Sequence, residues 1–193
     1  DVLRELFNFG TTRASQALSQ LLHDDVRLSV PRVARVTPRQ LPGCVVESFD
    51  EGLAYVRQPF NGQASGTACV LFTTRNGIGI INAILEQHTE AAQATLSSVD
   101  ADLLQEVGSI LVNAMVGALA ESLGLAFRFG LPVCRVAEPL AVCGELQIDP
   151  ARAVLYVETL FVMPGRNLGG TLVLLLESAN LDPLLGQLEA RGR

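Results

Sequence analysis

The sequence DVLRELFN at residues 1–8 recurs in altered form as DLLQEVGS at residues 102–109. Each copy has an acid, a second acid four residues later and a polar residue three residues after that. In both copies 22 residues then lead to a proline, Pro31 in the first and Pro132 in the second, so every position is displaced by 101 residues. One position changes in kind, from Asn8 to Ser109. The repeat predicts two related sites on one molecule, and the substitution predicts that they are unequal.

Two long helices are predicted to carry these copies. Over residues 1–23 the apolar side chains recur at the spacing of one helix face, and Asp24-Asp25 is expected to close the helix. A second helix over about residues 100–123 repeats the first. Ser97-Ser98 is placed to cap its start, and Gly124 to terminate it.

The other ordered segments are predicted to be strands and one further helix. Val26–Val36 favours a strand that runs past Pro31, and Asn61-Gly62 is typical of a hairpin between extended segments. Residues 45–74 are expected to form strands that are broken at Asn61-Gly62 and at Gly66. The remaining expected elements are a helix over residues 78–96 and strands over residues 154–163 and 170–176.

The later part of each copy also recurs, at an offset of 104 residues. Gly66-Thr67 recurs as Gly170-Thr171, and Asn76 recurs as Asn180. The change of offset predicts about three additional loop residues in the second half. We therefore predict an α+β fold with an antiparallel sheet beside long helices, in which two repeats (about residues 1–99 and 100–193) pack about a pseudo-twofold axis as one domain spanning residues 1–193.

Composition limits the classes of partner. The chain has 193 residues, of which 49% are hydrophobic and 18% are charged, so it is long enough and apolar enough to bury a core. Its net charge of −6 argues against nucleic acid or an anionic membrane as the main partner. A protein partner with a basic patch stays compatible with this charge.

No segment is interpreted as a transmembrane helix or a signal peptide. Polar and charged residues interrupt the apolar stretch 103–127, and the start of the chain lacks a basic region leading into an apolar one. We interpret that start as trimmed, because it has no Met. The four cysteines show no C-x-x-C spacing, which favours free thiols in a reducing cytoplasm. The two histidines are too far apart in sequence to indicate a zinc site.

Polar residues at steps of four, three and four share one helix face. We call Asp1, Glu5, Asn8 and Thr12 the first ridge, and Asp102, Glu106, Ser109 and Asn113 the second ridge. An acid and an amide at this spacing are also typical of an ordinary solvated helix surface. Shared ancestry of the halves would preserve the pair without any function, so the residues alone leave both interpretations open.

The spacing of the two copies resembles the CheC family, the CheC/CheX/FliY group of chemotaxis phosphatases. The similarity covers essentially the whole chain. It extends from residues 5–10 to the segment Ser29–Val33 in the first half, and from residues 106–111 to the segment Leu123–Leu125 in the second half. The resemblance implies a cytoplasmic enzyme that hydrolyses the aspartyl-phosphate of a CheY-type response regulator.

The resemblance also implies roles for single residues. Asn8 would orient the attacking water, since a carboxamide both donates and accepts hydrogen bonds, and Glu5 would dock on a lysine of the regulator. The regulator would supply Mg²⁺, so the chain would need no metal or cofactor of its own. For Asp1, a contact with the regulator and a favourable interaction with the helix dipole both stay open. Some members also bind the receptor deamidase CheD.

The second site departs from the family pattern at Ser109. A serine hydroxyl is shorter than a carboxamide and has one donor, so Glu106 would still dock the regulator while the water is poorly held. Asn113 lies about 10 Å along the helix from Glu106, too far to replace the amide.

Two other functions are weighed beside the phosphatase. One is a non-catalytic binding or adaptor module for the phosphorylated regulator or CheD. The other is a small-molecule enzyme, which the sequence disfavours because it contains no Gly-rich phosphate loop and no Ser/His, Cys/His or metal-ligand spacing. A monomer is expected, because a duplicated chain already contains its own pseudo-dimer.

Overall fold

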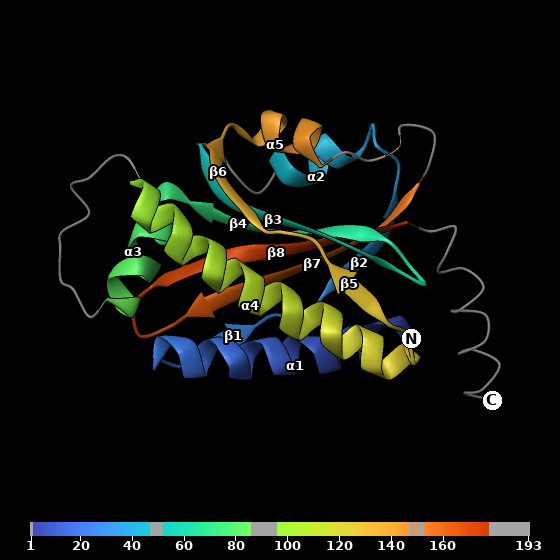
Figure 1. Ribbon diagram of the computed structural model, residues 1–193, viewed down its shortest axis with the longest axis horizontal. Helices are drawn as coiled ribbons and strands as arrows, with labels where there is room; N and C mark the ends of the chain where they lie inside the picture. Colours follow the sequence, from blue (N-terminus) through green and yellow to red (C-terminus); the bar gives the residue numbers. More distant parts are fainter. Residues whose placement is uncertain (1, 47–51, 86–95, 147–148, 150–152, 178–193) are drawn as a thin grey trace.

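The computed structural model describes residues 2–46, 52–85, 96–146, 149 and 153–177. A sheet lies between two layers of helices (Figure 1). On one face pack the long helices α1 (Val2–Leu22) and α4 (Ser98–Leu123) together with α3 (Thr74–Ile84). On the other face lie the short helices α2 (Leu41–Val46) and α5 (Pro139–Glu145). Each layer encloses its own hydrophobic core against the sheet.

The sheet is antiparallel throughout and has eight strands among the described residues. Its order is β1-β7-β8-β4-β3-β5, with β2 beside β7 next to β1, and β6 beside β3 next to β5. This α+β architecture with an antiparallel sheet is the one predicted from the sequence. The strands are β1 (Arg27–Leu28), β2 (Arg32–Val36), β3 (Leu53–Gly62), β4 (Gly66–Thr73), β5 (Phe127–Phe129), β6 (Val133–Ala137), β7 (Val154–Met163) and β8 (Leu168–Glu177).

Strand register follows the offsets seen in the sequence. Strand β7 matches β3 at 101 residues, and the pair Arg32↔Glu158 has its counterpart in Val133↔Arg57. At the centre of the sheet Cys69 pairs with Val173, its own counterpart at an offset of 104. These strand pairs of one half are therefore matched by pairs of the other at the offsets of the repeat, and the pseudo-twofold duplication stays a prediction.

The predicted strand Val26–Val36 is wrong at Pro31, where it divides into β1 and β2. Along this edge Leu28 pairs with Phe161 and Arg32 with Glu158, so four steps on one strand oppose three on its neighbour. Such an extra residue is a β-bulge, and proline favours it because it has no N–H to donate to the ladder. The second half repeats the bulge between β5 and β6, at Pro132.

Two short helices were not predicted, and residues 45–46 belong to one of them rather than to a strand. Helices α2 and α5 contain Pro and Gly, which lower helix propensity. They form because Leu41 and Val45 of α2 pack with Val142 and Leu146 of α5 in the second core. Tertiary packing, rather than local helix propensity, therefore accounts for the formation of α2 and α5.

The ends of the longer helices follow local capping chemistry. Ser97 and Asp100 form a reciprocal capping box at the start of α4, and Gly124 ends it with a left-handed φ of 65°, as predicted. Helix α3 begins at Thr74 rather than residue 78, because the Thr73 hydroxyl accepts the N–H of Asn76 at 3.2 Å. The rest of that predicted helix, at residues 86–95, and Asn180 lie outside the described residues.

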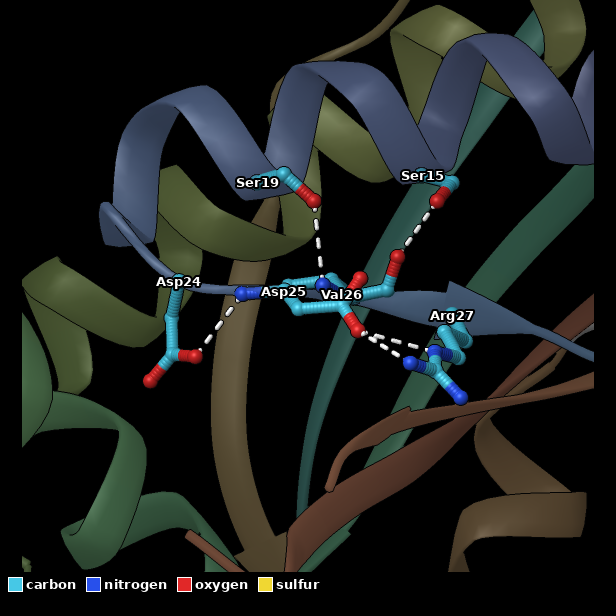
Figure 2. Close-up of polar contacts among 6 residues, drawn as sticks. All are labelled: Ser15, Ser19, Asp24, Asp25, Val26 and Arg27. Carbon is cyan, nitrogen blue, oxygen red and sulfur yellow. Dashed lines mark hydrogen bonds and ion pairs between the residues drawn. The ribbon is translucent and has the colours of Figure 1, made fainter. Parts of the chain in front are cut away.

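Two serines in the second half of α1 form hydrogen bonds with Val26, the residue that precedes strand β1 (Figure 2). Ser15 donates to the carbonyl oxygen of Val26 at 2.5 Å, and the Val26 N–H donates to Ser19 Oγ at 3.0 Å. Asp24 accepts Arg166 Nε at 2.7 Å, which ties this corner to the β7–β8 turn. The Arg166 guanidinium and the Asp25 N–H hold the pKa of the Asp24 carboxyl below its usual range. These contacts fix the direction of α1 along the sheet.

Helix α4 approaches the sheet closely at Gly108. A Cβ at this position would lie 2.6 Å from Val56 Cβ on β3, whereas a Cβ at Gly117 on the same helix would meet nothing within 4 Å. We expect Gly108→Ala to lower the free energy of unfolding by about 1–3 kcal/mol through overpacking. Gly117→Ala, the matched control, should be neutral or stabilise by up to about 1 kcal/mol, since alanine favours helix. Urea unfolding midpoints measure both, and equal midpoints would contradict this account of the packing.

Candidate functional site

Helices α1 and α4 lie side by side and run in opposite directions along one face of the molecule (Figure 1). Helix α1 buries Phe7, Ala14 and Leu18 completely, and α4 buries Leu104 and Leu111 in the same core. Their polar faces therefore point to solvent. This outer face is where the sequence placed both ridges.

The described part of the first ridge is accessible. Asn8 and Thr12 are exposed, and the Asn8 carbonyl oxygen accepts the hydroxyls of Thr11 at 2.8 Å and Thr12 at 3.0 Å. Among the side chains that the structure describes, none hydrogen-bonds to the Asn8 carboxamide. Glu5 lies on α1, one turn before Asn8, but its side chain and the whole of Asp1 fall outside the described part.

The second ridge is also on the surface but differs at its central position. Asp102, Glu106 and Asn113 are exposed, whereas Ser109 is half-buried. The difference between the two sites is therefore larger than the exchange of amide for hydroxyl. Ser109 offers a shorter side chain from a less accessible position than Asn8 does. The roles of all four residues, Glu5, Asn8, Glu106 and Ser109, stay predictions.

Between helices α1 and α4 runs an open groove of about 360 Å³. Arg13 lies at its edge and forms an ion pair with Glu121 of α4 at 2.5 Å, and its guanidinium lies 4.8 Å from the centre of the Phe9 ring. This cluster was not among the residues predicted from the sequence. The spacing of Phe9 and Arg13, four residues apart, was the available signal, but Glu121 is distant in sequence. The groove is lined by Arg13, Gln16, Ala17, Gln20, Asn113, Ala114, Gly117 and Ala118.

The strongest pKa shifts lie away from the ridges. Burial and a hydrogen bond to Glu145 raise the pKa of Tyr55 on the α2/α5 side of the sheet, and the same bond holds the pKa of the Glu145 carboxyl below its usual range. All four cysteines are free thiols, as predicted. Burial raises the pKa of Cys134 to about 11, with Asp102 adding to the shift, so this thiol is protonated at neutral pH. Of these groups, Tyr55 lies in the second core, whereas Asp102 belongs to the second ridge.

Within the described part of the chain, no group of three or more His, Cys, Asp and Glu side chains is arranged to hold a metal ion. One helix there, over Ser98–Ser122 of α4, is long and apolar enough to span a membrane by length and composition, which the sequence analysis did not expect. Half of that stretch is buried inside the molecule, where α4 packs on α1 and the sheet.

Comparison with known proteins identifies this architecture. No family model matches the sequence. The structure of FliY from Thermotoga maritima superposes with a TM-score of 0.76 at 15% identity, over 96% of this chain and 93% of that one. The chemotaxis protein CheX from Desulfovibrio desulfuricans gives 0.57 at 16% identity, over 90% and 99%.

The chain has the CheC-like fold. The fold extends to flagellar proteins: FliM from a FliG–FliM complex of H. pylori superposes with a TM-score of 0.67 at 11% identity, over 95% of both chains. These identities are too low to transfer any residue's role. The CheC-like fold expected from the repeated segment is thus confirmed, and the chemistry must be argued from the ridges.

Proposed function

We propose that this chain is a chemotaxis phosphatase of the CheC family, which hydrolyses the aspartyl-phosphate of a CheY-type response regulator. One observation carries the proposal: Asn8 stands exposed, with its carboxamide unengaged by described side chains, on the outward face of α1 in a CheC-like fold. The spacing Glu5-x2-Asn8 matches the family pattern, and CheX, a chemotaxis protein by name, shares the fold.

In this mechanism the chain supplies positioning and the regulator supplies the reactive group. Glu5 binds the lysine beside the regulator's phosphoaspartate through a charge-assisted hydrogen bond. The Asn8 carboxamide holds a water in line with the bond between phosphorus and the aspartyl oxygen. The water oxygen attacks phosphorus and the P–O bond to the aspartate breaks. The aspartate is released as a carboxylate, and inorganic phosphate leaves as H2PO4⁻ with both protons of the water.

The regulator's own Mg²⁺ stabilises the charge that develops on the phosphoryl oxygens. The chain then requires no metal of its own. It would act in the cytoplasm as a monomer, where the phosphorylated regulator is formed. CheD is a second proposed partner, since some members of the family bind it.

A binding module is the second candidate. The exchange of Asn8 for Ser109 in the second ridge and the fold shared with FliM, solved in complex with FliG, favour it. Such a module would hold the phosphorylated regulator, or CheD, without turnover. It predicts tight binding without faster loss of phosphate.

The test is the decay of a radiolabelled, phosphorylated CheY-type regulator with and without the chain. We expect wild type to accelerate the decay, Glu5→Ala/Asn8→Ala to abolish the acceleration, and Glu106→Ala/Ser109→Ala to retain most of it. No acceleration by wild type, together with binding of the phosphorylated regulator, would replace the phosphatase by the binding module. If wild type neither accelerates the decay nor binds the regulator, both the phosphatase and the binding module are rejected.

A further inference from the structure

An exposed aromatic side chain lies one residue from Asn8 and is held from two helices. The Phe9 ring is 44% exposed, and Arg13, one turn further along α1, lies over it at 4.8 Å. Glu121 on α4 binds Arg13 at 2.5 Å. Arg13 therefore contacts the Phe9 ring on its own helix and a carboxylate on the other helix. We call Phe9, Arg13 and Glu121 the Phe9 cluster.

The Phe9 cluster contributes little to holding the fold together. Arg13 and Glu121 are 45% and 60% exposed, and exposed ion pairs stabilise proteins only weakly. Phe9 is not part of either hydrophobic core. These contacts restrict the Phe9 ring, because Arg13 lies over its face and Glu121 holds Arg13 in place.

The cluster occurs on one side of the pseudo-twofold axis only. At the offset of 101 residues, Ile110 replaces Phe9, Ala114 replaces Arg13, and Gln20 is the counterpart of Glu121. Ile110 and Ala114 are half-buried, so the second ridge has neither an exposed ring nor a cation beside it. The half that retains the asparagine is therefore also the half that presents a positioned aromatic surface.

We propose that the Phe9 cluster is the docking contact that directs the phosphorylated response regulator to the first ridge. Phe9 lies one turn after Glu5 on the same side of α1, so a regulator seated on Glu5 and Asn8 reaches the ring. A rigid aromatic side chain gives a large contact area at low entropic cost, and aromatic and arginine residues carry much of the energy of protein interfaces. The proposal rests on the proposed function and adds a basis for choosing between its two sites.

Binding and turnover together test this role. The probe is a CheY-type regulator activated with beryllofluoride, titrated by fluorescence anisotropy, with kcat and KM measured on the phosphorylated form. We expect Phe9→Ala to raise both Kd and KM about tenfold and to leave kcat unchanged. Arg13→Ala and Glu121→Ala should raise them by smaller factors, and Arg13→Lys, which keeps the cation, should recover most of the binding.

Two control variants separate docking from loss of any exposed side chain. Leu131→Ala removes an apolar residue that is 85% exposed between β5 and β6, and Gln20→Ala removes the counterpart of Glu121. Both should bind the regulator as wild type does. Phe9→Ala with wild-type Kd, or a fall in kcat at unchanged KM, would overturn the docking role while leaving the phosphatase intact. Failure of wild type to bind the regulator would overturn both proposals.

Discussion

Replacement of Asn8 by alanine should slow the dephosphorylation of the regulator about 100-fold while leaving its binding unchanged. The exposed carboxamide is the group proposed to hold the attacking water, and alanine provides neither its donor nor its acceptor. Asn8 takes no part in the buried face of α1, so its loss should leave folding intact. Single-turnover decay of the phosphorylated regulator measures the rate, and anisotropy with the beryllofluoride form measures binding.

A control for Asn8 is available on the same helix. Gln16 is also an exposed amide on α1, two turns beyond Asn8 and outside the first ridge. Gln16→Ala should retain wild-type rates. If Asn8→Ala retained them too, the water would be held by another group, and the assignment of the first ridge as catalytic would fail. A parallel loss of rate and binding would make Asn8 a docking residue instead.

The long elements could be predicted because their signals are local. Helix α4 is bounded by a capping serine and a terminating glycine, and residues 154–163 alternate as a half-buried strand does. The repeat also helped, because each segment could be compared with its counterpart in the other half of the sequence. It predicted equivalent strands in the two halves, and β3 and β7 occupy equivalent positions at the predicted offset.

The short elements could not be predicted because their causes are distant in sequence. Helices α2 and α5 are held by each other, across nearly 100 residues of chain, and neither has strong propensity. The division of the first strand at Pro31 depends on its pairing with β7. Strands β5 and β6 were not predicted, because their sequences are too short to show a pattern of their own.

The candidate site was predicted in outline. Helical spacing alone placed Asn8, Thr12, Glu106 and Asn113 on solvent-facing surfaces, and all four are exposed. It did not anticipate that Ser109 is half-buried, because that depends on neighbouring elements rather than on α4 itself. The Phe9 cluster was missed for the same reason: Glu121 comes from another helix.

In this architecture the fold and the chemistry depend on different residues. FliY, CheX and FliM share the sheet and paired helices at identities of 11–16%, so the core tolerates nearly complete replacement of its sequence. Function must then depend on the few exposed residues that the scaffold presents. The two ridges of this chain differ at such positions, since α1 carries Asn8 and Phe9 where α4, at an offset of 101 residues, carries Ser109 and Ile110.

This asymmetry leads to a rescue experiment with a large expected effect. In the inactive Asn8→Ala background, Ser109→Asn should restore dephosphorylation to within roughly tenfold of wild type, since Glu106 is exposed and the repeat places residue 109 where Asn8 stands. Recovery should appear in kcat, with a KM above that of wild type, because Ile110 and Ala114 do not reproduce the Phe9 cluster.

The same rescue distinguishes two reasons for a silent second site. If the missing carboxamide is the cause, Asn8→Ala/Ser109→Asn is active and loses its activity again on Glu106→Ala. If the partial burial of position 109 is the cause, the double variant stays as slow as Asn8→Ala, although it folds and binds the regulator. That second outcome would contradict the prediction that the missing carboxamide silences the second site, and would make the exposure of the asparagine as important as its chemistry.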